Sequence, residues 1–116
     1  MSADVKPIYL TDNETGMEYT LEFNRESVVF AERHGFEIGD VSRFPMSKIP
    51  ELWYYAFRMH HKNVPREKTD KMLEWAGGFT EDLMVRLGEL YSAPFEALTG
   101  GDKPEGEENP RMTVKL

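Results

Sequence analysis

The sequence predicts an α+β fold that is mainly α-helical, with an N-terminal β-hairpin packed on a small bundle of about four helices. Residues 17–23 alternate strictly between apolar and polar side chains, which is the period of a half-buried strand. Later segments instead repeat apolar residues at the spacing of one helix face. A chain of 116 residues has the size of one domain. We therefore expect a single globular domain over residues 1–99 and a flexible tail over residues 100–116.

The predicted hairpin covers residues 7–23. Its first strand follows Pro7, and the turn residues of the stretch 12–16 end in a glycine that can adopt a positive φ. An isolated hairpin is marginally stable in water, so its apolar face should pack on the helices or on a neighbouring subunit. That face consists of Met17, Tyr19, Leu21 and Phe23.

The first helix is expected over about residues 25–34, between Asn24 as N-cap and Gly35 as terminator. Phe36 should fold back onto this helix, as a residue just past such a glycine often does.

The second helix is expected over about residues 48–62, after Ser47 as N-cap. Pro50 would then lie in the first turn, where its missing N–H costs nothing. The remaining polar residues and the tyrosines lie beside or behind the apolar face of this helix. The face itself consists of Ile49, Leu52, Trp53, Ala56, Phe57 and His60.

The third and fourth helices are expected over about residues 66–76 and 81–98. Thr80 is the expected N-cap of the fourth helix, and Pro94 should kink that helix or divide it in two. The fourth helix carries a sustained apolar stripe, which consists of Leu83, Leu87, Leu90, Tyr91, Pro94, Phe95 and Leu98.

The predicted tail ends in a short alternating segment at residues 111–116. Met112, Val114 and Leu116 would share one face of a strand, after a stretch whose Gly, Glu and Pro content is typical of a flexible linker. Such a segment could dock on another chain. The alternatives are that it closes onto its own hairpin or is disordered.

Composition excludes several classes of function. The chain has no cysteine, which removes disulfides, thiolate metal sites and cysteine nucleophiles. No apolar run has the length of a signal peptide or a membrane span, so neither export nor membrane insertion is expected. The formal net charge of -7 argues against non-specific binding to nucleic acid.

Charge is distributed unevenly along the chain. Residues 1–40 contain three bases and nine acids, whereas residues 41–76 contain seven bases and four acids. An acidic front and a basic middle could attract one another between copies of the chain. The alternative is solvated surface charge without consequence.

We find no catalytic constellation in the sequence. His34, His60 and His61 lack the spacing of a zinc cage, and we expect His60 to be partly buried and His61 to lie at the surface. The carboxylates of Glu81 and Asp82 are explained by helix capping rather than by acid–base chemistry. Neither a nucleophile elbow nor a phosphate-binding glycine loop occurs. We therefore expect no enzyme activity, no cofactor and no metal site.

A basic stretch surrounds the second and third helices. Bases next to aromatic residues can bind single-stranded nucleic acid. Acidic residues are interleaved here, and the whole chain is acidic, so a solvated face or contact with an acidic protein is the better interpretation. The stretch consists of Arg58, Lys62, Arg66, Lys68 and Lys71.

Several motifs carry a family resemblance. They are the run LWYYAFRMHHKNVPREKTDKMLE at residues 52–74, the following GG, LGELYSAPFEAL at residues 87–98, the hairpin from Leu10 to Arg25, and the ending NPRMTVKL. Together they resemble the tail assembly chaperone family of long-tailed, siphovirus-type phages and prophages, which is similar in role to the lambda G-type protein.

The resemblance implies a chaperone that binds the tape measure protein, keeps it soluble and recruits subunits of the major tail protein. It would act in the cytoplasm of the host bacterium and be absent from the mature virion. Self-association is expected, either head-to-tail or as a closed dimer, whereas nucleic acid and membranes are not expected as partners. The alternatives are a structural tail component retained in the virion and a small nucleic-acid-binding phage regulator.

A long, helical, apolar partner requires an exposed apolar or aromatic surface. For Trp53, Phe57, Leu87 and Leu90, the alternative is burial in the core. Tyr54 and Tyr55 are better candidates for exposure, because one helix cannot bury every face in so small a bundle. The candidate partner-binding residues are Trp53, Tyr54, Tyr55, Phe57, Arg58, Leu87, Tyr91, Phe95, Met112, Val114 and Leu116.

Overall fold

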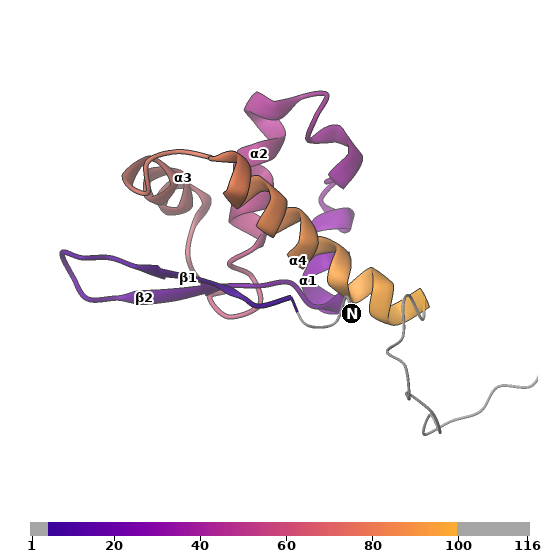
Figure 1. Ribbon diagram of the computed structural model, residues 1–116, viewed down its shortest axis with the longest axis horizontal. Coiled ribbons are helices and arrows are strands. Elements are labelled where there is room, and N and C mark those ends of the chain that lie inside the picture. The colour runs from indigo at the N-terminus through magenta and orange to yellow at the C-terminus, as the bar shows by residue number, and fades with distance from the viewer. Residues whose placement is uncertain (1–4, 100–116) are drawn as a thin grey trace, which may run out of the picture.

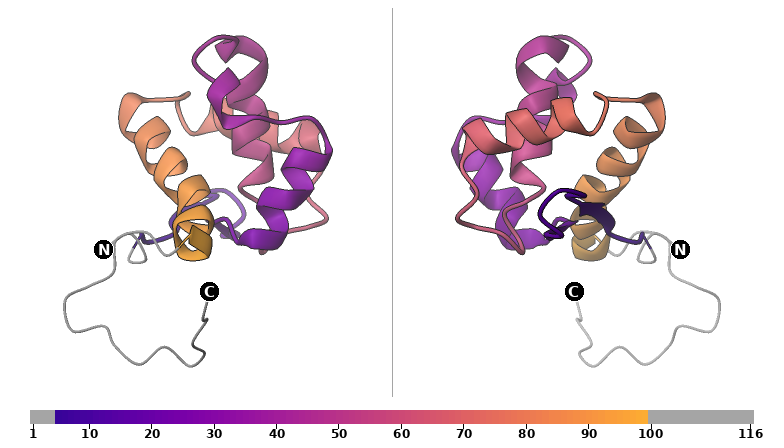
Figure 2. Two further views of the ribbon diagram at one scale, coloured as in Figure 1. Left: turned by 90° about the vertical axis from the view of Figure 1, so that its right-hand side faces the viewer. Right: turned by 90° about the vertical axis from the view of Figure 1, so that its left-hand side faces the viewer.

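The computed structural model describes residues 5–99 and confirms the predicted fold class, because an N-terminal hairpin precedes a set of α-helices (Figure 1). Viewed along the hairpin, α4 stands on one side and α1 on the other, with the hairpin near their lower ends (Figure 2). The strands are β1 at Ile8–Thr11 and β2 at Glu18–Leu21. The helices are α1 at Arg25–Arg33, a 3-10 turn η2 at Ile38–Asp40, α2 at Pro45–Tyr55, α3 at Arg66–Trp75 and α4 at Glu81–Thr99.

The hairpin pairs β1 antiparallel to β2, with Ile8 opposite Leu21 and Leu10 opposite Tyr19. Its turn depends on Asp12, whose Oδ1 accepts the backbone N–H of Glu14 at 2.9 Å. This hydrogen bond lowers the pKa of the Asp12 carboxyl. Tyr19, Leu21 and Phe23 are buried as predicted, but Met17 is exposed. Met17 lies next to the turn of the hairpin, whereas Tyr19 packs against Phe57 and His61, which follow α2.

Both predicted boundaries of α1 are confirmed. The side chain of Asn24 accepts the backbone N–H of Ser27 at 2.8 Å, and Ser27 Oγ accepts the backbone N–H of Asn24 at 2.9 Å. At the other end, Gly35 has a φ of 86°. The N–H of Phe36 then donates to the carbonyl of Ala31 at 3.0 Å, and the Phe36 ring is buried.

The predicted second helix was wrong at both ends. Helix α2 begins at Pro45, directly after Phe44, so Ser47 is inside the helix and is not its N-cap. Pro50 lies well inside the helix rather than in its first turn. The helix ends at Tyr55 and not near residue 62. After it, the carbonyl of Ala56 accepts the N–H of Glu22 at 3.0 Å, so the chain continues as turns held against β2.

The bounds of α3 and α4 agree with the prediction to within one residue. Thr80 caps α4, because its Oγ1 accepts the backbone N–H of Leu83 at 3.1 Å. The alternative that Pro94 divides the last helix was wrong, because α4 runs through it to Thr99. An interior proline removes one backbone hydrogen bond and crowds the carbonyl four residues before it, but the hydrogen bonds on either side of Pro94 keep α4 continuous.

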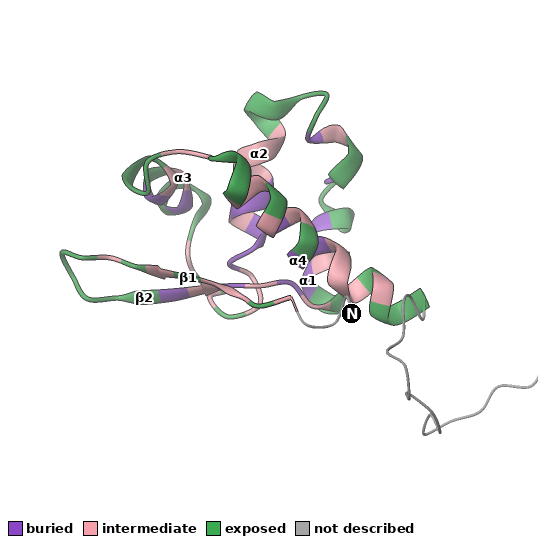
Figure 3. Ribbon diagram, viewed as in Figure 1, coloured by how far each residue is buried: buried purple, intermediate pink, exposed green. Residues whose placement is uncertain are grey.

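The core fills the space between the apolar face of the hairpin and helices α1, α2 and α4, and α4 changes from buried to exposed toward its C-terminal end (Figure 3). Trp53 is at its centre, and its Nε1–H donates to the carbonyl of Thr69 in α3 at 2.7 Å. This bond satisfies the one polar atom of a fully buried indole and fixes α3 against α2.

Within residues 5–99, no helix is long and apolar enough to cross a membrane. The predicted tail over residues 100–116, with its docking strand at residues 111–116, lies outside the described residues.

Candidate functional site

Of the eleven predicted partner-binding residues, eight are described by the structure and five of these are part of the core, whereas Met112, Val114 and Leu116 lie outside the described residues. Trp53, Phe57 and Leu87 are fully buried, so for them the alternative of burial in the core is confirmed. They are therefore unavailable to a partner. Tyr91 is also buried. The expectation that Tyr55 is exposed was wrong, because only 7% of its surface is accessible, whereas Tyr54 is half-buried.

An aromatic cluster explains the burial of Tyr55 and Tyr91. The Phe36 ring lies 5.6 Å from both the Tyr55 ring and the Tyr91 ring, and Phe23 meets Tyr91 edge-to-face at 5.0 Å. Burial raises the pKa of Tyr91 to about 12 and also raises the pKa of Tyr55. The cluster joins α1, α2 and α4 to the end of the hairpin, and no spacing within one helix could reveal it.

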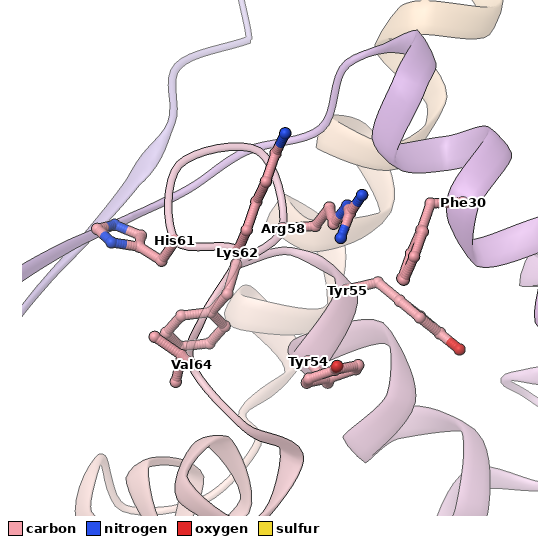
Figure 4. Close-up of a pocket in the computed structure, with 8 residues that line it drawn as sticks. Phe30, Tyr54, Tyr55, Arg58, His61, Lys62 and Val64 are labelled. Atoms are coloured by element: carbon pink, nitrogen blue, oxygen red, sulfur yellow. The ribbon is translucent and has the colours of Figure 1, made fainter.

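Arg58 and Tyr54 border a small hollow that holds no ligand-sized space (Figure 4). The Arg58 guanidinium lies 3.8 Å from the centroid of the Phe30 ring, and its Nη2 donates to Glu26 Oε2 at 3.2 Å. The remaining volume is about 10 Å³, which is room for about one water. Arg58 therefore stabilises the contact of α1 with the turns after α2. In this ion pair, an acid of residues 1–40 meets a base of residues 41–76 within one chain.

The two adjacent histidines bind the same strand in different ways. His60 Nε2 lies 2.8 Å from Glu22 Oε1 at the surface, whereas His61 Nε2 accepts the backbone N–H of Thr20 at 2.9 Å. The predicted exposures were therefore reversed, since His61 is half-buried and His60 is exposed. Partial burial lowers the pKa of His61, and the nearby His60 lowers it further.

The last turns of α4 carry apolar side chains that residues 5–99 leave exposed. Phe95 is 65% exposed and Leu98 is 58% exposed, although the same stripe is buried at Leu87 and Leu90. The apolar stripe of α4 is thus longer than the core on which it packs. An exposed apolar surface of this kind is typical of a protein-binding site.

Beside these turns lies an open groove with a volume of about 530 Å³, which we call the α4 groove. Its floor includes the buried side chains of Phe23 and Leu90, and its rim carries Glu22 and Arg25, which have opposite charges. The groove is lined by Val5, Glu22, Phe23, Asn24, Arg25, Leu90, Ala93, Pro94, Ala97 and Leu98.

The small side chains of Ala93 and Ala97 stand one helical turn apart on α4 and leave the groove open. Of the predicted binding residues, Phe95 alone lies on these turns of α4. None of the groove residues was predicted as a binding residue, although Leu90, Pro94 and Leu98 had been placed in the apolar stripe and Phe23 in the apolar face of the hairpin. Val5 and Phe23 come from the other end of the described chain, so only the fold brings them to α4.

The described residues give the α4 groove apolar side chains with charged residues at its rim. Within residues 5–99, no group of three or more His, Cys, Asp or Glu side chains could hold a metal ion. The α4 groove offers apolar contact area with a charged rim, which is the composition that a protein-recognition surface uses.

Comparison with known proteins gives one match. A model of the family described as Domain of unknown function (DUF5055) matches residues 1–116, so the chain belongs to that family. No curated protein and no solved structure matches the chain. Its function therefore has to be inferred from the surface that the fold presents.

Proposed function

We propose that this member of the DUF5055 family is a phage tail assembly chaperone, which binds the tape measure protein, keeps it soluble and recruits tail-tube subunits. The observation that carries the proposal is the α4 groove, with Phe95 and Leu98 exposed on the same turns of α4. The family resemblance of the sequence supports the choice of partner.

The shape of the groove suits an apolar helix. A tape measure protein is long, helical and apolar, and such a helix binds by laying its apolar face into a hydrophobic groove. Phe23 and Leu90 are core residues with only 5% and 2% of their surface accessible, so they hold the floor rigid, and a partner would contact the more exposed Leu98. A preformed floor of this kind lowers the entropy lost on binding.

The charged rim of the α4 groove would orient a bound helix. Glu22 and Arg25 have opposite charges and lie on one side of the groove, at the junction of the hairpin with α1. The polar flank of an amphipathic helix could pair with both residues. Rim charges of this type contribute more to the rate and direction of association than to its affinity.

Co-expression with the tape measure protein of the same phage tests the proposal. The expected result is a soluble complex, whose mass and copy number light scattering coupled to size exclusion would determine. A tape measure protein that remains as insoluble with this chain as without it would overturn the proposal.

Variants at the groove test the surface. Leu98→Asp places a charge on the exposed edge of the groove, and we expect the yield of soluble complex to fall at least about tenfold, since burying an unpaired carboxylate costs well over 1.4 kcal/mol. Val85→Asp is the matched control, because Val85 is 52% exposed on the same helix but does not line the groove. Equal loss in both variants, or in neither, would exclude the groove as the binding surface.

A further inference from the structure

The outer edge of β2 is already covered by the chain itself. The N–H of Thr20 donates to His61 Nε2 at 2.9 Å, and the N–H of Glu22 donates to the carbonyl of Ala56 at 3.0 Å. The turns after α2 therefore accept two N–H groups of this edge, those of Thr20 and Glu22. The bond to His61 also shows that the N–H of Thr20 points away from β1.

The outer edge of β1 is different. The N–H of Asp12 donates to the carbonyl of Met17 at 2.8 Å, which makes these residues a hydrogen-bonded pair. Hydrogen-bonded and non-hydrogen-bonded pairs alternate along an antiparallel ladder. Given the register, Tyr9 and Thr11 belong to non-hydrogen-bonded pairs, so their N–H and C=O groups point outward.

Only the beginning of this edge is occupied by the helices. The carbonyl of Pro7 accepts Nη2 of Arg86 in α4 at 3.3 Å. Beyond it, no hydrogen bond within residues 5–99 reaches the outward backbone groups of Tyr9 or Thr11, and the Tyr9 side chain is 71% exposed. The hairpin extends past the helices at its turn (Figure 1). An unpaired edge of this kind is a template for another strand.

We propose that residues 111–116 of the same chain add a third strand to this edge of β1. The pairing would use the two N–H and two C=O groups of Tyr9 and Thr11 that point outward. Strand addition of this type gains affinity from the main chain and specificity from alternate side chains. The proposal does not depend on what binds in the α4 groove.

The pattern of the segment matches the two faces of the sheet. Ile8 and Leu10 lie on the face that packs against the core, and Met112, Val114 and Leu116 would extend that face by one strand. The bases of the segment would then lie on the opposite face, which carries Glu18 on β2 and Glu22 just after it. Two strand spacings are about 10 Å, which is longer than the Debye length of about 8 Å at physiological salt, so this attraction would act mainly at low salt.

The length of the intervening chain permits the pairing. Val5, just before β1, and Leu98, at the end of α4, line the same groove, so the chain leaves α4 close to the start of the hairpin. Residues 100–110 can span up to roughly 36–40 Å, whereas a strand of four residues is about 13 Å long. A segment on so short a linker has an effective concentration in the millimolar range, which favours its own hairpin over that of a second copy.

Disulfide trapping tests the proposal, because the chain has no cysteine of its own. Tyr9→Cys is combined in turn with Arg111→Cys, Thr113→Cys or Lys115→Cys. Residues opposite each other across two strands present their side chains on the same face, so at least one of these pairs should oxidise. Tyr9→Cys with Met112→Cys or Val114→Cys is the matched control, since those side chains would lie on the other face.

The expected product is an intramolecular disulfide, seen as a monomer of changed mobility on a non-reducing gel. Disulfide-linked dimers as the main product would mean that the segment pairs with a second copy. Disulfide yields no higher than those of the controls would mean that the segment does not pair with this edge. Either result overturns the proposal.

Hydrogen exchange gives a second, independent readout. The amides of Tyr9 and Thr11 should exchange at least about tenfold more slowly in the wild-type chain than in Val114→Pro, in which the segment cannot complete a ladder. The Tyr19 amide belongs to a hydrogen-bonded pair of the existing ladder and serves as the internal control. Equal exchange rates of Tyr9 and Thr11 in both proteins would contradict the third strand.

Discussion

His61 Nε2 lies 2.9 Å from the backbone nitrogen of Thr20 and accepts its N–H, although 41 residues separate the two in sequence. The acceptor must be an unprotonated ring nitrogen, so the bond exists only while His61 is neutral. Together with the bond from Glu22 to Ala56, it fixes the hairpin to the turns after α2. The stability of the hairpin is thereby coupled to the titration of one side chain.

Acidification should destabilise the protein through His61. Burial lowers the pKa of His61 below its ordinary value of 6.5. The unfolded state therefore binds more protons below pH 6.5, so the stabilisation is complete above that pH and is lost as the pH falls toward the lowered pKa. Urea unfolding at about pH 7.5 and about pH 5 should show a lower free energy of unfolding at the acidic pH.

His61→Gln separates this effect from other titrations, because glutamine offers an acceptor that does not titrate. We expect the free energy of unfolding of the variant to differ less between the two pH values than that of the wild-type chain. His60→Gln is the control, since His60 contacts the carboxylate of Glu22 and no backbone donor. If His61→Gln kept the full wild-type difference, the coupling would have to be assigned to another group.

Trp53 should be the more sensitive of the two tryptophans. Trp53→Phe removes the indole donor to Thr69 and leaves a small void, which should lower the free energy of unfolding by about 1–3 kcal/mol. Trp75→Phe should change it by less than about 0.5 kcal/mol, because Trp75 is 65% exposed. Urea denaturation followed by circular dichroism measures both, and similar effects would contradict the burial difference.

Two glycines should respond to alanine with opposite signs. Gly35 has a φ of 86°, so Gly35→Ala should destabilise the protein by about 1–2 kcal/mol, although an added Cβ meets no atom within 4 Å. Gly88 lies inside α4, where an added Cβ also meets nothing within 4 Å, so Gly88→Ala should stabilise by about 0.4–1 kcal/mol. Thermal unfolding of the two variants compares them directly, and the same sign for both would be unexpected.

The capping box of α1 provides a test of the helix boundaries. Asn24→Ala should lower the free energy of unfolding by about 1 kcal/mol, because the N–H of Ser27 loses its acceptor. Ser47→Ala is the control at the position where a cap was expected from sequence. Since Ser47 is exposed and α2 begins before it, we expect a change below about 0.5 kcal/mol. Chemical denaturation would distinguish the two, and equal losses would mean that Ser47 does act as a cap.

Local rules located most elements correctly. The alternation at residues 17–23 indicates a strand, and Asn24 with Gly35 delimits α1, because each of these signals acts on neighbouring backbone groups. The end of α2 was predicted too late, since residues 56–62 also have helical spacing. There the carbonyl of Ala56 bonds to the N–H of Glu22 in the hairpin, a partner that helix spacing cannot reveal.

The candidate site divides in the same way. Phe95 was predicted as a binding residue and is exposed, whereas Tyr55 was also predicted and is buried by Phe36 from another element. Periodicity identifies which residues share a helix face, but it does not show how far along the helix a partner extends. The sequence therefore showed one continuous apolar stripe along α4 and gave no sign that its C-terminal part is exposed.

The sequence by itself determined the fold class, the hairpin, most helix ends and the absence of cysteine chemistry. Tertiary structure alone decided where the core stops along α4, which aromatic side chains remain accessible, and which hairpin edge the rest of residues 5–99 leaves without hydrogen bonds. The physical reason is that backbone propensity and capping act within a few residues, whereas burial and edge pairing depend on contacts such as that of His61 with Thr20, which form only when distant segments meet.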